Sequence, residues 1–276
     1  MTDTTPSSRF LTLPAELRLA ILDFALSSQN NGDGFCNRSP VWPGGLYLDE
    51  NYSSSSSNLG ILLTCRQFRH DFTVLAFSRI PFVITDIYSS LLTRLNILQS
   101  HQISAIRHLT FVAGARQFRE MVHWHRYPFN VEALRLDSLK VVLHRSAHWH
   151  YPSDFTSDMV SLLRRLQHVQ SLSFFRNGAN VKGFFKTWYN RLIGLVLKED
   201  HYQRYDAPSA PNVEDTWWDW GFDDSGEWFE LQAREKRALL AEEEYLEGMR
   251  PMVERLMREM EREEVDPDPR ARNGWA

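Results

Sequence analysis

Two groups of histidines contain the residues of this chain that are best suited to metal chemistry. His123 and His125 flank a tryptophan, and His144, His148 and His150 form the second group. Zinc needs three or four ligands that converge tetrahedrally, and imidazole is a common one. On a helix, however, two histidines separated by one residue point to different faces, and no cysteine or carboxylate motif completes the set. The sequence therefore predicts surface histidines in aromatic-rich loops, with no metal site and no other cofactor.

Cys65 is the residue to consider as a nucleophile, because His70 lies five positions further along the same predicted helix. Residues at this spacing are poor neighbours, and Cys65 falls on the apolar face, where an inert buried thiol is expected. The chain also contains no GxSxG elbow, no GxxxxGK phosphate-binding loop and no GxGxxG fingerprint. We therefore predict a protein that is not an enzyme and that has no catalytic residue.

The segment from Asp215 to Asp224 combines tryptophans with aspartates, which is the most unusual composition in the chain. Tryptophans anchor many protein interfaces, so an acidic aromatic strip could bind a partner. Alternatively, the rings fold back onto the body of the protein and attach the C-terminal helix to it. The residues that would bind a partner are Trp217, Trp218, Trp220 and Trp228.

Residues 10–26 carry the clearest start signal of a helix. Pro14 suits the first helical position, where its fixed φ angle is favourable and its missing N–H would have gone unbonded. Glu16 then falls at the third position, from which its carboxylate can reach back to the backbone N–H of Leu13. Such a short helix is marginal alone, so it needs a partner.

The partner is a second predicted helix at residues 59–77, and the two apolar faces are expected to pack together. Their residues are Leu13, Leu17, Ile21 and Phe24 in the first helix, and Ile61, Cys65, Phe68, Phe72 and Leu75 in the second. The insert between them, residues 27–58, is rich in Gly, Pro, Asn and Ser and predicts a loop, with a short hairpin around Gly44 as the alternative. Leu46, Tyr47 and Leu48 could attach this insert to the surface.

The motif Leu13-Pro-Ala-Glu-Leu17, followed by Leu62-Leu-Thr-Cys-Arg-Gln-Phe68, resembles the F-box-like module at the N-termini of many proteins of filamentous fungi. The resemblance covers residues 10–86 and includes a predicted strand at residues 81–85. Two features differ from an ordinary F-box. The insert separates the two helices, and Phe68 stands where a tryptophan is usual.

The resemblance implies a role in recruiting proteins. An F-box presents Leu-Pro and the helix behind it to a Skp-type adaptor, which links it to a cullin ubiquitin ligase, while the rest of the chain recruits a protein substrate. The positions that match the adaptor-binding motif are Leu13, Pro14, Leu17, Ile21, Leu63, Cys65 and Phe68. The alternatives are an F-box-like scaffold protein without a ligase connection and, more remotely, a hydrolytic or metal enzyme built on an α/β sheet.

Beyond the F-box-like helices, short apolar strands alternate with helices, and Leu109, Leu139 and Leu172 occupy similar places in three such units. These units cannot cover their own apolar faces, so neighbours stack and form a parallel sheet. The predicted fold class is mixed α/β with a small, mainly parallel sheet. Residues 87–206 form this region, as a degenerate leucine-rich-repeat-like arrangement or an irregular α/β layer. The predicted strands lie at residues 81–85, 106–112, 134–144 and 169–175, and the predicted helices at 87–100, 115–126, 154–167 and 184–200.

The C-terminal part is predicted as a linker and Trp/Asp-rich segment at residues 207–226, followed by a long charged helix at residues 227–264. Pro251 should break or kink this helix, because it removes one backbone hydrogen bond and clashes with the preceding turn. The charged residues favour a solvated face over a coiled coil. Residues 1–9 and 265–276 are predicted to be disordered.

The bulk composition narrows the class of protein. A chain of 276 residues with 43% hydrophobic residues can bury a sizeable core, and a net charge of −4 argues against a nucleic-acid-binding protein. There is no long apolar run for a membrane span and no apolar signal sequence at the N-terminus. With only two cysteines, Cys36 and Cys65, no structural disulfide is expected. We therefore expect a protein of the cytoplasm or nucleus that binds other proteins.

Overall fold

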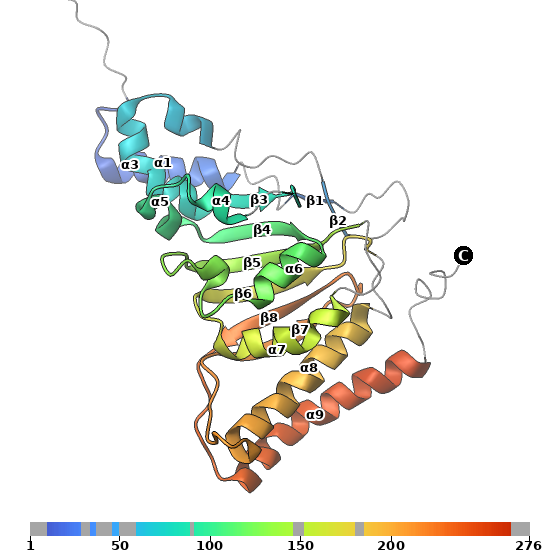
Figure 1. Cartoon of the computed structure of the whole chain (residues 1–276). Helices are drawn as coiled ribbons and strands as arrows, with labels where there is room; N and C mark the ends of the chain where they lie inside the picture. Colours follow the sequence, from blue (N-terminus) through green and yellow to red (C-terminus); the bar gives the residue numbers. More distant parts are fainter. Residues whose placement is uncertain are drawn as a thin grey trace, which may run out of the picture.

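A computed structural model describes residues 10–28, 34–36, 46–49, 59–88, 91–145, 152–179 and 185–265 (Figure 1). Disorder is predicted for residues 1–9 and 265–276, and of these only Val265 is described, as the last residue of α9; Gly44 in the insert also lies outside the described ranges. The elements are arranged along one central sheet, with α1 (Ala15–Ser28) beyond one edge and α9 (Glu242–Val265) beyond the other.

The central sheet has six strands in the order β3-β4-β5-β6-β8-β7. Strands β3 to β6 follow one another in chain order and are parallel, whereas β8 runs antiparallel to both of its neighbours. The mixed α/β fold with a mainly parallel sheet is therefore confirmed. The strands are β3 (Pro81–Ile84), β4 (His108–Ala113), β5 (Leu136–Leu143), β6 (Val169–Phe175), β7 (Trp217–Phe222) and β8 (Trp228–Arg234).

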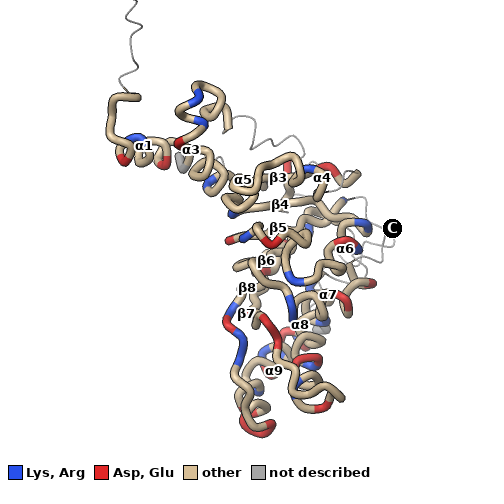
Figure 2. The backbone as a smooth tube through the Cα atoms, turned by 60° about the vertical axis from the view of Figure 1, so that its left-hand side comes forward, with Lys and Arg blue, Asp and Glu red and all other residues tan. Residues whose placement is uncertain are grey.

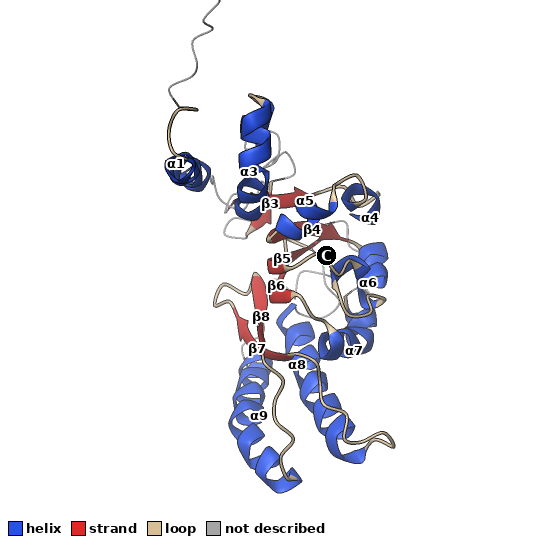
Figure 3. Ribbon diagram, turned by 90° about the vertical axis from the view of Figure 1, so that its left-hand side faces the viewer, coloured by secondary structure: helices blue, strands red, loops and turns tan. Residues whose placement is uncertain are grey.

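Helices connect the parallel strands, and α6, α7 and α8 lie on one side of the sheet (Figure 3). The helices between the parallel strands range from five residues in α4 to ten residues in α7, and α8, which follows β6, has 17 residues. The repeat-like order of the strands is therefore combined with irregular connections. The helices are α4 (Leu91–Leu95), α5 (Ser100–Ala105), α6 (Ala115–Val122), α7 (Thr156–Arg165) and α8 (Phe185–His201). Short helical turns η2 (Pro128–Asn130) and η3 (Ser153–Phe155) precede β5 and α7.

The single helix predicted at residues 87–100 is wrong, because α4 ends at Leu95 and a separate helix, α5, begins at Ser100. The first ends in a tight turn in which the Leu98 N–H donates to the Leu95 carbonyl at 2.9 Å. A new helix then begins, and the Gln102 side chain accepts a hydrogen bond from the Gln99 N–H at 2.9 Å. Local capping by a glutamine thus interrupts an apolar pattern that is otherwise compatible with one helix.

Rows of apolar residues run across the sheet in exact register. Leu109, Leu139 and Leu172 are directly paired across β4, β5 and β6, and Leu231 of β8 extends the row. All four are buried. A second buried row on the same face contains Phe111, Val141, Phe174 and Phe229. Because alternate side chains of a strand share a face, both rows point to the side that the helices cover.

The insert covers part of the opposite face of the sheet. Its described residues form a two-stranded antiparallel ladder of β1 (Phe35–Cys36) and β2 (Tyr47–Leu48). Leu48 packs against the carboxyl ends of β4, β5 and β6, where its neighbours are Val112, Val142 and Phe175. The Leu48 N–H also donates to the Asn177 side chain at 2.9 Å. The predicted attachment through Leu48 is therefore confirmed, and the loop prediction for the whole insert is wrong for these two strands.

The C-terminal helix begins at Glu242, so the prediction of one helix over residues 227–264 is wrong in its first part. Residues 228–234 form β8, in which Phe229 and Leu231 are buried while Glu230 and Gln232 are only half-buried. This alternation has the period of a strand, and pairing with β6 and β7 outweighs the helix preference of the charged residues. Further along, α9 continues through the exposed Pro251 instead of ending there.

A buried ionic network joins α7, α8 and α9 where they meet the end of the sheet. The Arg204 side chain is fully buried in the π-helical turn η4 (Tyr202–Asp206) that continues α8. Its Nη2 donates to both carboxylate oxygens of Glu214, at 2.8 and 2.6 Å, and its Nε donates to Asp200 at 3.0 Å. Asp200 also accepts from Arg164 at 2.8 Å and from the Tyr245 hydroxyl at 2.7 Å.

The pKa values of the two carboxyl groups in this network shift in opposite directions. Burial by itself would raise the pKa of Asp200, but the hydrogen bond from Tyr245 and the charge of Arg204 hold it below the ordinary value. Burial raises the pKa of Glu214, and the nearby charge of Asp200 adds to this effect. Asp200 is thus the carboxylate that the network keeps charged.

Replacing Arg204 by methionine should lower the free energy of unfolding by roughly 3 to 5 kcal/mol, because Asp200 and Glu214 would remain buried without their shared cation. Urea unfolding at neutral pH measures this loss. The matched control is Arg234→Met, which breaks an exposed ion pair with Asp219 and should cost less than about 1 kcal/mol. Equal losses in the two variants would contradict a structural role for the buried network.

Candidate functional site

The N-terminal unit consists of α1, the short helical turn η1 (Leu59–Leu63) and α3 (Arg66–Arg79), and it packs beyond β3 (Figure 1). Leu22 and Leu26 of α1 are buried and belong to the same hydrophobic core as Phe72 and Ala76 of α3. This buried side attaches the unit to the rest of the protein.

Two ion pairs fix the rotation of α1 against α3. Arg18 contacts Asp71 at 2.8 Å, and Arg79 contacts Asp23 at 2.7 Å. The Arg18 side chain is almost completely buried, which favours this geometry because its charge needs a partner. The hydrogen bond with His70, together with the charge of Arg18, lowers the pKa of Asp71. The orientation of α1 is therefore set by charge pairing as well as by apolar packing.

The opposite side of α1 is apolar and open to solvent. Leu17, Ile21 and Phe24 are exposed by 53%, 46% and 76%, and the preceding Pro14 is exposed too. These four residues recur at spacings of three, four and three, so they lie on one face of the helix. We name this face the α1 surface. Leu63, at the end of η1, is exposed by 84% and adds a further apolar side chain to the N-terminal unit.

The prediction that Leu17, Ile21 and Phe24 pack against the second helix is therefore wrong. Apolar residues are spread around most of α1, so their spacing does not define a single inward face. The pairing of Arg18 with Asp71 places Leu22 and Leu26 inside and leaves the α1 surface outside.

The second predicted helix is divided at Cys65. This residue is the N-cap of α3, and its Sγ accepts a hydrogen bond from the Phe68 N–H at 3.4 Å. Cys65 is half-buried, so the prediction of a buried thiol on a helix face is wrong. A cysteine side chain caps the helix as a serine would, which explains why the helix starts one residue later.

Of the seven positions that match the adaptor-binding motif, Leu13, Cys65 and Phe68 are half-buried and the other four are exposed. Phe68 contacts Phe10 and Phe72 edge-on, with both ring-centroid distances at 5.2 Å. Its ring therefore stabilises the N-terminal unit from within. The exposed set is Pro14, Leu17, Ile21 and Leu63.

The four tryptophans predicted to bind a partner divide into a buried pair and a half-buried pair. Trp217 and Trp218 are buried, so the interpretation of these two as partner-binding residues is wrong. The Trp218 indole N–H donates to the Leu163 carbonyl at 2.8 Å, and Arg237 lies 3.8 Å from the centre of the Trp217 ring. Both rings attach the β7–β8 hairpin and the segment before α9 to the body of the protein. Trp220 and Trp228 are half-buried.

The histidines do not come together in the described part of the chain. His123 bonds to the Arg119 carbonyl at 2.6 Å on its own helix, and His125 lines a separate pocket, while His148 and His150 lie outside the described residues. No group of three or more metal-ligating side chains occurs among the residues that the structure describes. Cys36 and Cys65 form no disulfide.

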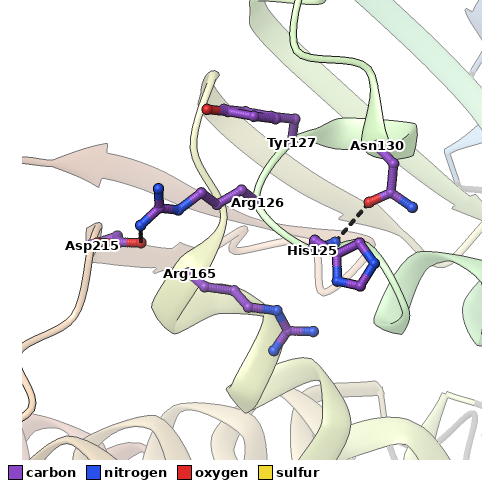
Figure 4. A pocket seen from close by; sticks show the side chains of 6 residues that line it. All are labelled: His125, Arg126, Tyr127, Asn130, Arg165 and Asp215. Carbon is purple, nitrogen blue, oxygen red and sulfur yellow. Dashed lines mark hydrogen bonds and ion pairs between the residues drawn. The ribbon is translucent and has the colours of Figure 1, made fainter.

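A pocket that the sequence did not indicate lies between η2, α7 and the segment before β7 (Figure 4). Its lining residues come from three separate parts of the chain, so no linear motif could have revealed them. They are His125, Arg126, Tyr127, Asn130, Arg165 and Asp215.

Basic and acidic residues are intermixed along the described backbone (Figure 2). None of the helices in the described ranges is both long and apolar enough to span a bilayer.

Comparison of the chain with protein-family models, with curated proteins and with solved structures finds no match. The functional interpretation therefore rests on the motif and on the surfaces described above.

Truncation of two neighbouring residues of α1 should change the free energy of unfolding by very different amounts. Leu22→Ala removes a buried side chain and should lower the free energy of unfolding by roughly 2 to 5 kcal/mol. Ile21→Ala removes an exposed side chain and should change it by less than about 0.5 kcal/mol. Denaturant unfolding of both variants measures this contrast. A large loss for Ile21→Ala would mean that the α1 surface is needed for folding.

Proposed function

We propose that this chain is a non-enzymatic F-box-like receptor that binds a Skp-type adaptor of a cullin ubiquitin ligase through the α1 surface. The observation that carries the proposal is the exposure of Pro14, Leu17, Ile21 and Leu63, the positions at which the Leu-Pro motif predicts adaptor contacts. In this proposal the α/β body recruits the protein that the ligase modifies.

The physical argument is that the α1 surface is both apolar and held in place. Contiguous apolar patches on a protein surface mark sites of interaction more often than scattered exposed residues do. Here the patch lies on a helix whose other side is anchored by buried leucines and by the ion pairs of Arg18 and Asp23. A partner would therefore meet a preformed face and would not pay the entropy of ordering it.

The α/β body offers a second surface, on the central strands of the sheet. The face of the sheet away from the helices is half-exposed near the amino ends of the strands, where polar side chains replace the apolar rows. Ser171 donates to Glu230 across this face at 2.5 Å, and Lys140 and Gln232 lie on it as well. We propose this face as the recruiting surface for a protein of the cytoplasm or nucleus. The half-buried Trp228 lies at the carboxyl end of β6, where its ring stacks on Phe175.

A scaffold protein without a ligase connection is the second candidate. The observation that favours it is the packing of the insert, because β1 and β2 join the N-terminal region to the far face of the sheet. In that case the F-box-like helices serve mainly to complete the fold, and the α1 surface binds a different protein.

The test is co-expression of the chain with a Skp-type adaptor of its host, followed by affinity purification and size-exclusion chromatography. A one-to-one complex is expected for the wild type. The double variant Leu17→Glu with Ile21→Glu should lose it, because two charges in the interface would have to be desolvated. The fold should persist, since both side chains are exposed.

The matched control is Ile97→Glu, which adds a charge at an apolar residue that is 80% exposed and outside the N-terminal unit. This variant should bind the adaptor as the wild type does. Absence of any complex with the wild type would favour the scaffold candidate. Retention of the complex in the double variant would refute the assignment of the α1 surface.

A further inference from the structure

The pocket at the amino ends of β5 and β6 has a volume of about 560 Å³, the size of a site for a small molecule. Figure 4 shows Arg126 and Asp215 on one side of it, and the His125 ring and the Arg165 guanidinium on the other. The pocket lies outside the N-terminal unit and does not depend on the adaptor proposal.

Arg165 brings a half-buried positive charge to this pocket without a carboxylate beside it. Its Nε and Nη2 donate to the backbone carbonyls of Val122 and Trp124 at 3.0 to 3.2 Å. Nη1 makes no hydrogen bond within the described ranges of the chain. Burial lowers the pKa of Arg165, and only the more distant charge of Asp158 opposes this. An anion at Nη1 would supply the missing counter-charge.

Arg126 adds a second guanidinium. Among the described residues it contacts one acid, Asp215, at a long 3.4 Å from Nη2, and both side chains are well exposed. Two guanidinium groups therefore line the pocket with one carboxylate, which leaves an excess of positive charge. The His125 ring forms no hydrogen bond to the described residues and can contribute a further N–H.

Tyr127 provides a flat wall. Its ring stacks on His168, with the centroids 4.5 Å apart and an angle of 28° between the planes. His168 is held in turn by a contact of its Nδ1 with the Glu132 carbonyl at 3.0 Å. One face of the tyrosine is thus occupied, and the ring is fixed where it lines the pocket.

The backbone around the pocket adopts uncommon angles and is held by hydrogen bonds. Phe129, Asn130 and His168 have φ values of 55°, 59° and 63°, in the left-handed region that residues other than glycine seldom adopt. The Asn130 side chain holds the loop by accepting from the His125 N–H at 2.7 Å, and the Gln167 N–H donates to the Arg126 carbonyl at 2.7 Å. Such geometry costs stability, and it often marks sites where the fold keeps side chains in place for binding.

We propose that this pocket binds a small ligand that carries an oxyanion, either a carboxylate or a phosphate, on a planar ring. The Arg165 guanidinium binds the oxyanion through Nη1, and the His125 ring on the same side of the pocket supplies a further donor. The ring lies against Tyr127. Asp215 keeps Arg126 oriented and does not neutralise Arg165.

Isothermal titration calorimetry of the full chain with benzoate, phenyl phosphate and inorganic phosphate tests this proposal. A ring oxyanion should bind, and the ranking of benzoate and phenyl phosphate identifies the anionic group. Arg165→Gln should weaken binding about tenfold or more, since it removes a charge-assisted hydrogen bond, and His125→Ala should weaken it as well. Arg119→Gln, at an exposed arginine of α6 outside the pocket, should leave the affinity unchanged.

His125 is exposed, so its variant reports on binding even where Arg165→Gln perturbs the local backbone contacts. Failure of all three compounds to bind, or unchanged affinity in Arg165→Gln and His125→Ala, would overturn the proposal. Inorganic phosphate binding as tightly as phenyl phosphate would also overturn it, because the ring would then contribute nothing. Adaptor co-purification with His125→Ala should match the wild type, which separates this test from that of the proposed function.

Discussion

The alignment of apolar residues across the sheet is the constraint on which the remaining structure depends. Leu109, Leu139, Leu172 and Leu231 form one continuous row because their strands pair without a shift in register. A slip of one residue in any strand would turn these side chains to the opposite face. The helices can cover only one such face, so the register decides where α6, α7 and α8 must pack.

Because the helices cover one face of the sheet, the opposite face and the far edge must be protected by other segments. The opposite face needs protection at the carboxyl ends of the strands, where Val142 and Phe175 are apolar, and β1 and β2 of the insert supply it. At the far edge, the β7–β8 hairpin ends the parallel run, and buried Trp217 and Trp218 anchor it. The buried network around Arg204 then fixes α9 against α8. The tryptophans and charged residues of this C-terminal region therefore stabilise the fold.

The two candidate surfaces differ in how far the sequence could predict them. The α1 surface comes from one short motif, so its residues could be named from the sequence, but their exposure could not. Apolar spacing in α1 is compatible with more than one inward face, and the buried pair of Arg18 with Asp71 decides between them. The pocket lined by Arg126 and Arg165 could not be predicted, because its residues become neighbours only when the segment around η2, the end of α7 and the segment before β7 meet.

The sequence by itself determined the mixed α/β class, the positions of β3 to β6 and the alignment of the three leucines, because local apolar spacing specifies these features. The tertiary structure decided what local spacing leaves open. It made a strand of residues 228–234, because pairing partners on both sides outweigh helix preference. It also turned Leu17 and Ile21 outward and buried Trp217 and Trp218, because burial depends on contacts between residues distant in the chain.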